Sequence, residues 1–248
     1  MRRLLAGISF LSRLPVPGNL TFDAADVGKA TLLFPLVGAL LGGIQALGAI
    51  TFGARLPAFL AAALLVALSA LVTGALHLDG LADMADGFGG GRTREDVLRI
   101  MRDHAIGAYG AVALIVVLAI KVAALTTLIP TVDGWRVLIA AAALARWGSV
   151  PLSRLLPYAR REGGGLGAAR TDHVGPLELL GSTVLAGAFA FGLCGWQRGG
   201  ILWAGAAFVS LANGRMCLDR IGGVTGDTLG ANTEVCEAIV YVLAVAVG

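Results

Sequence analysis

Long apolar runs, separated by short polar stretches, dominate the chain. A helix needs ~20 residues to cross the ~30 Å hydrocarbon core of a bilayer. Seven runs approach that length: 31–53, 57–76, 107–129, 135–156, 176–194, 199–214 and 233–247. Arg146 and Pro151 interrupt the fourth run and the sixth is short, so six spans also fit the pattern. The pattern therefore predicts an all-α, polytopic helical membrane protein with about seven (six to seven) transmembrane helices.

The composition supports this class and excludes others. Of the 248 residues, 57% are hydrophobic and only 14% are charged, whereas a soluble domain carries about 25% charged residues. The apolar content excludes a disordered chain, and three cysteines without CxxC or zinc-ligand spacing exclude a disulfide scaffold. The 36 glycines follow no Gly-X-Y period and favour close helix packing in lipid.

The basic residues predict the orientation in the membrane. With the N-terminus inside, fourteen of the 19 Lys and Arg fall in cytoplasmic segments, and only Arg55, Arg136 and Arg198 fall in the opposite loops. This asymmetry predicts a cytoplasmic or interfacial segment over 1–30 and cytoplasmic motifs over 77–106 and 215–232. It also accounts for the net charge of +3, so we expect contact with membrane lipid and no nucleic acid partner.

An acidic motif follows the second apolar run, in the stretch 77–87. On a helix that advances about 100° per residue, Asp79, Asp83 and Asp86 fall within an arc of about 60°. Like charges so arranged repel one another unless a cation lies among them, and an all-oxygen set favours Mg²⁺, Mn²⁺ or Ca²⁺. Gly80 would let a bulky ligand approach the backbone. We therefore predict a metal site on this face.

Two other interpretations of these acids remain open. They could lie on a solvated interfacial helix without a role, or form the coupling-ion or proton site of a transporter. Acidic residues in or near lipid are costly and usually functional, which argues against the first. The acids lie at the end of a span and not near its middle, where transporters bind their ions, which argues against the second.

Arginines follow the acidic motif closely. Arg92, Arg94, Arg99 and Arg102 come within 25 residues of the carboxylates, and a guanidinium group binds phosphate oxygens bidentately. Mg²⁺ is commonly held by a few carboxylates together with substrate phosphates. We therefore predict that these arginines bind a phosphate-containing substrate. Lys29 is either a further phosphate ligand or a lysine that extends from the span to the membrane surface.

A second polar motif covers 226–237. Asp227 and Glu234 are seven residues apart, hence on one helix face, and small residues lie between them. The motif is interpreted as a second wall of the same site, with Asn232 as a further substrate contact. The alternative is that Asp227 only caps the last helix.

Together these motifs resemble the cobalamin synthase family, the adenosylcobinamide-GDP ribazoletransferases. The resemblance is carried, essentially end to end, by the stretches 10–17, 34–38, 77–87, 99–107 and 226–231. It implies a multi-pass enzyme of the bacterial inner membrane that requires Mg²⁺. The all-oxygen ligand set also leaves Mn²⁺ open, and the count of basic residues predicts an active site that faces the cytoplasm. Its expected reaction joins adenosylcobinamide-GDP to alpha-ribazole or alpha-ribazole 5′-phosphate, releases GMP and gives adenosylcobalamin or its 5′-phosphate.

Taken with the resemblance, the residues give a specific hypothesis for the site. We expect 1–248 to form a single integral-membrane catalytic domain, and the sequence leaves a homo-oligomer open. An ion-coupled transporter and a CDP-alcohol-type lipid phosphotransferase remain the competing classes. The catalytic residues are expected to be Asp79, Asp83, Asp86 and Asp227, with Asp86 or Asp227 as the proton acceptor. The expected metal ligands are Asp79, Asp83, Asp86, Asp227 and Glu234; the expected substrate- or phosphate-binding residues are Arg92, Arg94, Arg99, Arg102, Lys29, Gly80 and Asn232.

Overall fold

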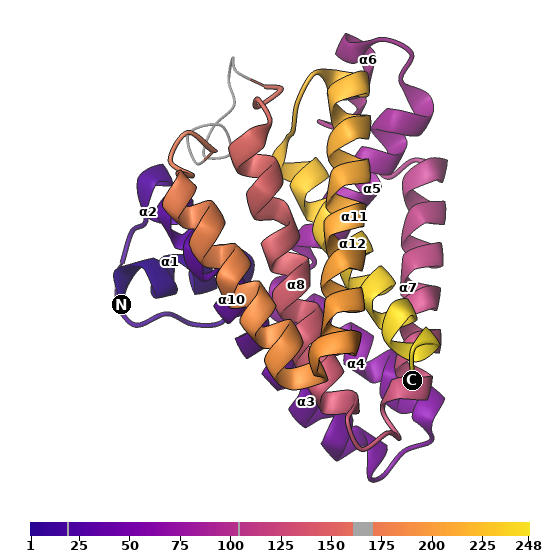
Figure 1. Cartoon of the computed structure of the whole chain (residues 1–248). Helices are drawn as coiled ribbons and strands as arrows, with labels where there is room; N and C mark the ends of the chain where they lie inside the picture. Colours follow the sequence, from indigo (N-terminus) through magenta and orange to yellow (C-terminus); the bar gives the residue numbers. More distant parts are fainter. Residues whose placement is uncertain (19, 104, 161–170) are drawn as a thin grey trace.

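The computed structural model is all-helical over the residues that it describes, which are 1–18, 20–103, 105–160 and 171–248 (Figure 1). Three residues used in the sequence predictions lie outside these ranges. They are His104, within the stretch 99–107 that carries the family resemblance, and Arg161 and Arg170, two of the fourteen basic residues counted as cytoplasmic. The elements are α1 (Arg2–Leu11), α2 (Ala24–Ala30), η1 (Thr31–Leu33), α3 (Phe34–Gly53), α4 (Ala58–Thr73), α5 (Leu76–Gly90), α6 (Arg94–Ile100), α7 (Ala108–Leu128), α8 (Gly134–Leu155), α10 (Pro176–Cys194), α11 (Trp196–Ile221) and α12 (Gly226–Ala246).

The predicted membrane class is confirmed by the length and composition of these helices. In the described part of the chain, five helices are long and apolar enough to cross a membrane, or six if the bent pair of α4 and α5 is one span. The predicted run 135–156 forms α8, which is not among them and which carries three arginines. Helices α3, α10, α11 and α12 surround α8, so its surface need not match lipid. The short run 199–214 proves to be part of the 26-residue helix α11.

The chain turns sharply between the second apolar run and the acidic motif. Helix α4 ends at Gly74, with φ at 64°, and Ala75 follows with φ at 58°, so two successive residues adopt the left-handed conformation. The amide of Ala75 donates to the carbonyl of Ala70, which closes the end of α4. Helix α5 then leaves at 93° to α4. Because of this turn, the acidic residues of α5 do not lie on a continuation of α4.

Close packing of small residues holds the centre of the bundle together. A Cβ added to Gly42 of α3 would lie 2.7 Å from the Cα of Ile139 in α8, so only glycine permits this approach. The neighbouring stretch of α8 contains a run of fully buried alanines from Ala140 to Ala143. Such small-residue contacts are typical of helix association in lipid, where backbones approach closely. The α3–α8 contact thus explains part of the high glycine and alanine content.

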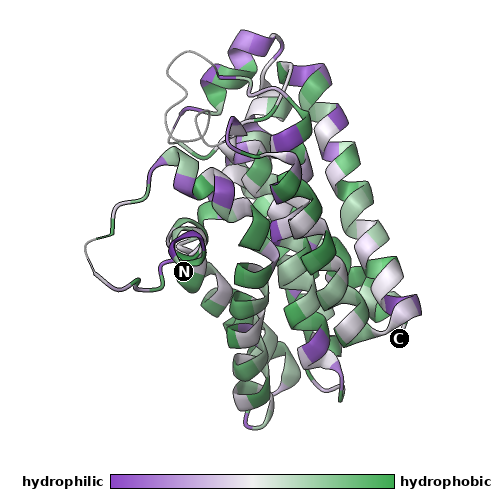
Figure 2. Ribbon diagram, turned by 60° about the vertical axis from the view of Figure 1, so that its left-hand side comes forward, coloured by the Kyte–Doolittle hydropathy of each residue, from purple (hydrophilic) through white to green (hydrophobic). Residues whose placement is uncertain are grey.

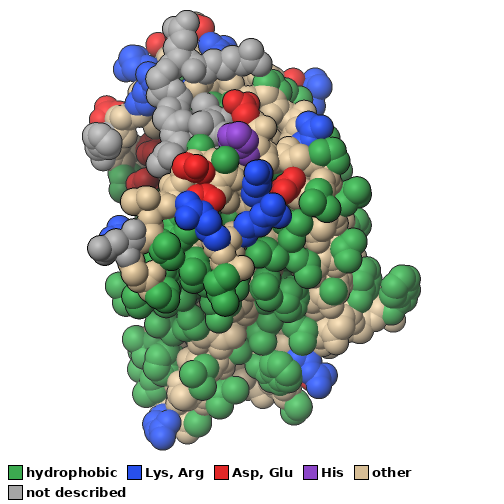
Figure 3. All heavy atoms as spheres, turned by 90° about the vertical axis from the view of Figure 1, so that its left-hand side faces the viewer, with side chains coloured by type: hydrophobic (Ala, Val, Ile, Leu, Met, Phe, Trp, Pro, Cys, Tyr) green, Lys and Arg blue, Asp and Glu red, His purple; other side chains and the backbone are tan. Residues whose placement is uncertain are grey.

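Charged side chains gather at one end of the molecule. Figure 2 shows the hydrophilic residues concentrated at the end that carries α5 and α6, with fewer at the opposite end. In Figure 3 acidic and basic side chains occupy the upper part of one face, and hydrophobic side chains cover most of the part below. Helix α1 packs against α2 and α3, and Arg2 forms an ion pair with Asp26. The charged end also carries the predicted acidic motifs.

Candidate active site

A pocket of about 270 Å³ at the charged end brings the two predicted acidic motifs together. Asp79 from the start of α5 and Asp227 from the start of α12 both line it, with Arg160 from the segment after α8. Its other lining residues include Phe10 of α1, Phe34 of α3 and Tyr158. Five parts of the chain, far apart in sequence, therefore meet at this pocket.

The N-terminus of α12 is fixed by its own side chains. The hydroxyl of Thr225 accepts a hydrogen bond from the amide of Thr228, and the Thr228 hydroxyl accepts one from the amide of Thr225. This reciprocal cap satisfies two amides that a helix start leaves without partners. Asp227 is thereby held in the first turn and presented to the pocket, where the Thr225 hydroxyl lies 3.4 Å from its carboxylate. Helix capping is thus done by the threonines, and Asp227 lines the pocket.

Gly80 lets α5 and α12 approach each other. A Cβ at Gly80 would lie 2.7 Å from the carbonyl oxygen of Asp227 and 3.0 Å from its Cα, both backbone atoms. Real Cβ atoms do not come this close, so any larger residue would push the two helices apart. The structure therefore gives Gly80 a packing role next to the site, which the sequence interpreted as room for a ligand.

Arg160 supplies the positive charge of the pocket. Its guanidinium lies 2.9 Å from the carboxylate of Asp227, and the two side chains are only 14% and 23% exposed. It also donates to the carbonyl of Met101, at 3.3 Å. A short parallel bridge places it there: the amide of Ala159 donates to the carbonyl of Val224, just before α12. No local sequence motif marks Arg160, because this pairing joins segments 65 residues apart.

Asp83 lies one helical turn beyond Asp79 and completes the acidic side of the site. It is partly buried, whereas Asp79 is exposed. Asp227, Asp79 and Arg160 are all within electrostatic range of the Asp83 carboxylate. The three carboxylates and one guanidinium leave an excess of negative charge.

No complete metal cage is formed by these acids. In the part of the chain that the structure describes, no three His, Cys, Asp or Glu side chains converge closely enough to hold an ion. The pocket nevertheless presents oxygen ligands from two helices, and Mg²⁺ typically uses one or two carboxylates and takes its remaining ligands from water and substrate phosphates. The donor set therefore fits a metal that binds together with a phosphate-containing substrate.

Asp86 has a different environment from the other two aspartates of α5. Its carboxylate accepts hydrogen bonds from the backbone amides of Gly107, at 2.7 Å, and Gly110, at 2.8 Å. These amides belong to the start of α7, where helix amides lack partners and an anion is favoured by the helix dipole. Asp86 is only 8% exposed. The structure thus places it at the cap of α7 and not in the lining of the pocket.

Of the arginines that follow the acidic motif, one holds segments of the protein together and the others lie on the surface. Arg94 donates to the carbonyls of Ile221, at 2.9 Å, and Ala159, at 2.7 Å, so it ties α6 to the segments that flank the pocket. Arg99 pairs with Asp96 on the surface of α6. The Thr93 hydroxyl, and to a lesser extent Arg99, hold the pKa of the Asp96 carboxyl below its usual range. The remaining predicted phosphate-binding cations, Arg92, Arg102 and Lys29, are exposed.

Asn232 lies in the interior and is not part of the pocket lining. It donates to the Ser210 hydroxyl, at 3.2 Å, and accepts a hydrogen bond from Asn213, at 3.4 Å. It therefore joins α12 to α11. The sequence assigned it to substrate because it lies in the same short motif as Asp227.

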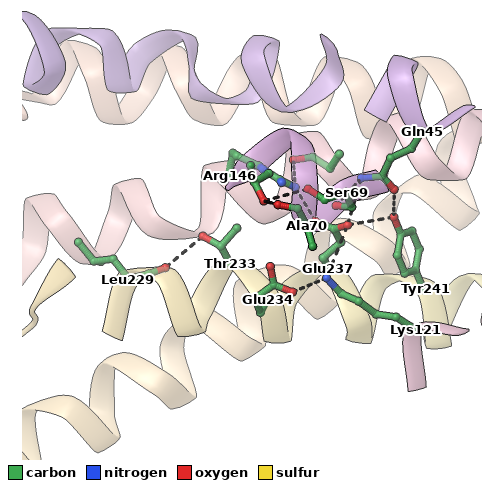
Figure 4. Close-up of polar contacts among 12 residues, drawn as sticks. Gln45, Ser69, Ala70, Lys121, Arg146, Leu229, Thr233, Glu234, Glu237 and Tyr241 are labelled. Atoms are coloured by element: carbon green, nitrogen blue, oxygen red, sulfur yellow. Dashed lines mark hydrogen bonds and ion pairs between the residues drawn. The ribbon is translucent and has the colours of Figure 1, made fainter. Parts of the chain in front are cut away.

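Glu234 belongs to a separate, buried charge cluster that also contains Lys121, Arg146 and Glu237 (Figure 4). Lys121 of α7 pairs with Glu234 and lies 3.7 Å from Glu237, and Arg146 of α8 lies 2.5 Å from Glu237. The four side chains are at most 7% exposed. The expectation that Glu234 forms a second wall with Asp227 is corrected here, because two helical turns along α12 carry it into the bundle.

The buried charge cluster is extended by neutral hydrogen-bonding groups. The Tyr241 hydroxyl lies 3.1 Å from the Glu237 carboxylate and 2.9 Å from the Gln45 side chain of α3. Sequence reasoning missed this cluster, although two cations and two acids in apolar runs offered a signal. Equal numbers of opposite charges in lipid-spanning helices indicate mutual pairing.

Comparisons with known proteins match the chain over nearly its whole length. The family model described as cobalamin-5-phosphate synthase matches residues 3–245. An adenosylcobinamide-GDP ribazoletransferase of Sinorhizobium medicae (strain WSM419) is 42% identical, over 97% of this chain and 95% of the relative. The protein of that name from Chlorobaculum tepidum is 39% identical, over 97% and 94%. No solved structure matches the chain. The chain therefore belongs to the cobalamin-5-phosphate synthase family.

Proposed function

We propose that this chain transfers the cobinamide phosphate of adenosylcobinamide-GDP to alpha-ribazole, or alpha-ribazole 5′-phosphate, with release of GMP. Relatives that cover nearly the whole chain carry the name of this transferase. The single structural observation that carries the proposal is the pocket in which Asp79 and Asp227 face Arg160. Carboxylates and a guanidinium group in one small pocket are the groups that phosphoryl transfer requires.

Asp227 and Arg160 have different roles in the proposed reaction. A ribose hydroxyl of the acceptor attacks the phosphorus that carries cobinamide, a new phosphorus–oxygen bond forms, and the bond to GMP breaks. Asp227 accepts the hydroxyl proton, as a general base within the pocket. Its protonation weakens the pairing with Arg160, whose guanidinium then interacts with the phosphate oxygens.

Asp79 and Asp83 are the residues proposed to hold Mg²⁺, or Mn²⁺, at this pocket. When bound, the ion neutralises the diphosphate oxygens and stabilises the charge on departing GMP. The two aspartates are four residues apart on α5, so their side chains point from the same helix face. The exposed cations Arg92, Arg99 and Arg102 remain candidates for contacts to outer phosphate oxygens of the donor.

We place the pocket on the cytoplasmic side of the bacterial inner membrane. The proposal rests on the concentration of basic and acidic residues at the pocket end of the bundle (Figure 3) and on the excess of basic residues in the loops there. The donor substrate is a large, charged nucleotide, which a cytoplasmic pocket can take up without passage across lipid.

The buried charge cluster is the one observation that favours a transporter instead. Two features argue against that function. The cations and carboxylates are paired with each other, and the cavity beside them has a volume of only about 10 Å³, at most room for a single water. A solute path through this point would have to break the ion pairs.

Direct measurement of the products tests the proposed function. Purified protein in detergent or lipid nanodiscs is incubated with adenosylcobinamide-GDP, alpha-ribazole and Mg²⁺, and GMP and the corrinoid are quantified by chromatography. We expect GMP and the joined corrinoid in equal amounts, and no GMP when alpha-ribazole is left out. A CDP-alcohol-type lipid enzyme or a transporter would release no GMP, and that result would refute the proposal.

A further inference from the structure

We infer that the pocket beside Asp79 and Asp227 binds the acceptor nucleoside, with its apolar aromatic base against Phe10; this inference rests on the proposed function. The donor and the acceptor differ greatly in size and polarity. The structure offers a small pocket with one charged part and one aromatic part, and these properties decide which substrate fits.

The size of the pocket points to the acceptor. Its volume of about 270 Å³ lies at the lower end of the range for small-molecule sites, ~300–1,000 Å³. A corrinoid macrocycle with its side chains is far larger than this space, whereas a nucleoside is of the right order. The bulk of the donor must therefore lie outside the pocket, with only its phosphates reaching the aspartates.

The aromatic part of the lining is built for a flat apolar ring. Phe10 of α1 is partly buried, and its ring is nearly parallel to that of Phe34, with a centroid distance of 6.1 Å and an angle of 13°. Phe34 is only 1% exposed, so it supports Phe10 from the interior of the protein. Aromatic rings at such separations favour a further stacked or edge-on ring.

The apolar lining also discriminates between the two aromatic bases of the reaction. Guanine, in the donor, carries several hydrogen-bond donors and acceptors on its edges, and burying them without partners is costly. The acceptor base is a substituted benzimidazole whose ring edge is mainly hydrocarbon. Leu76 and Leu229 join Phe10 in the apolar portion of the lining, and His77, Ser149, Tyr158 and Thr233 supply other hydrogen-bonding groups. The apolar portion around Phe10 therefore favours the acceptor base over guanine.

The orientation that results is chemically productive. With the base against Phe10, the ribose of the acceptor extends toward Asp227 and Arg160, which line the same pocket. A ribose hydroxyl is then next to the proposed proton acceptor. Helix α1, which the sequence indicated only as an interfacial segment, thereby becomes a determinant of acceptor specificity.

The test changes Phe10 and measures each substrate separately. Phe10→Leu keeps an apolar side chain but removes the ring, and Phe10→Tyr keeps the ring. We expect Phe10→Leu to raise KM for alpha-ribazole about tenfold, the order of one aromatic contact, with kcat and KM for adenosylcobinamide-GDP changed less than twofold. In the Phe10→Tyr variant, KM for alpha-ribazole should stay within about threefold of the wild-type value. Isothermal titration of alpha-ribazole alone into each variant should show the same loss of affinity.

A control variant and two contradicting results complete the test. Phe191 is stacked on Trp196 at 4.8 Å in another part of the molecule, so Phe191→Leu removes an equivalent ring and should leave both KM values unchanged. A rise in KM for the donor alone would place guanine at Phe10, and unchanged affinity for alpha-ribazole in Phe10→Leu would overturn the inference. Absence of GMP from the wild-type reaction would instead refute the proposed function.

Discussion

The guanidinium of Arg146 lies 2.5 Å from the carboxylate of Glu237, and both side chains are almost completely buried inside the helix bundle. Lys121 and Glu234 form a second ion pair within reach of the first. The two pairs join α7 and α8 to α12, the helix whose N-terminus presents Asp227 to the pocket. The buried charge cluster therefore helps to hold in place the helix that carries Asp227 into the candidate active site.

Removing one charge from this cluster should lower the free energy of unfolding more than removing two opposite charges that form an ion pair. Glu237→Gln leaves two buried cations facing one acid, and an uncompensated buried charge typically costs about 3–5 kcal/mol. The double variant Glu237→Gln with Arg146→Met removes both members of one pair, so it should be more stable than Glu237→Gln alone. Thermal unfolding of the purified variants in detergent measures this difference. A double variant less stable than the single one would show that the charges do not balance each other.

Asp86 offers a way to separate helix capping from metal binding. Asp86→Ala leaves two amides at the start of α7 without their acceptor and should destabilise the protein by roughly 2 kcal/mol. Asp86→Asn keeps one of the two acceptor oxygens but turns its own NH2 toward the second backbone amide, so it should recover only part of the stability. It should nevertheless keep at least a third of the wild-type turnover. Thermal unfolding and GMP release are measured on both variants. Turnover lost in a stable Asp86→Asn protein would return Asp86 to the catalytic residues.

Gly80 should tolerate no side chain. Gly80→Ala places a Cβ 2.7 Å from the carbonyl oxygen of Asp227, so α5 and α12 must separate and the pocket must distort. We expect turnover to fall at least tenfold with only a modest loss of stability, about 1–3 kcal/mol, as for other overpacking changes. Gly43→Ala is the matched control, because a Cβ there meets no atom within 4 Å. Equal turnover in the two variants would contradict the assigned role of Gly80.

Particular residues show what the sequence could predict and what it could not. The apolar runs predicted the membrane helices, and the spacing of Asp79 and Asp83 placed both on one face of α5, because these are local properties. The turn at Ala75 depends on a left-handed backbone conformation, which an alanine in the sequence does not predict. The cap that Asp86 provides and the pairing of Arg160 with Asp227 arise from contacts between distant segments. Periodicity within one helix carries no information about them.

Metal binding should depend on the substrate. Because no three acidic side chains in the described part of the chain form a cage, we expect weak binding of Mg²⁺ to the protein alone and tighter binding when a diphosphate supplies further oxygens. Titration of Mn²⁺, followed by its electron paramagnetic resonance signal, with and without adenosylcobinamide-GDP measures both affinities. EDTA should abolish turnover, and Mg²⁺ or Mn²⁺ should restore it. Full turnover in a thoroughly chelated preparation would exclude a metal requirement.

The two aspartates of α5 that are proposed to hold the metal can be tested by removing one charge at a time. Asp79→Asn and Asp83→Asn keep the size and most hydrogen bonds of each side chain but delete a negative charge. If these carboxylates hold the ion against the diphosphate, turnover should fall by a factor of about 10²–10³, the usual scale for the loss of transition-state charge stabilisation.

Stability should move in the opposite direction from turnover in these two variants. Asp83 lies within electrostatic range of Asp79 and Asp227, so removal of one of three repelling charges should leave the unfolding temperature unchanged or slightly higher. Asp96→Asn on the exposed helix α6 removes the same charge outside the pocket and serves as the control, with turnover near that of the wild type. A stable Asp83→Asn protein that keeps normal turnover at saturating Mg²⁺ would show that the metal is held elsewhere, because its proposed ligand would then be dispensable.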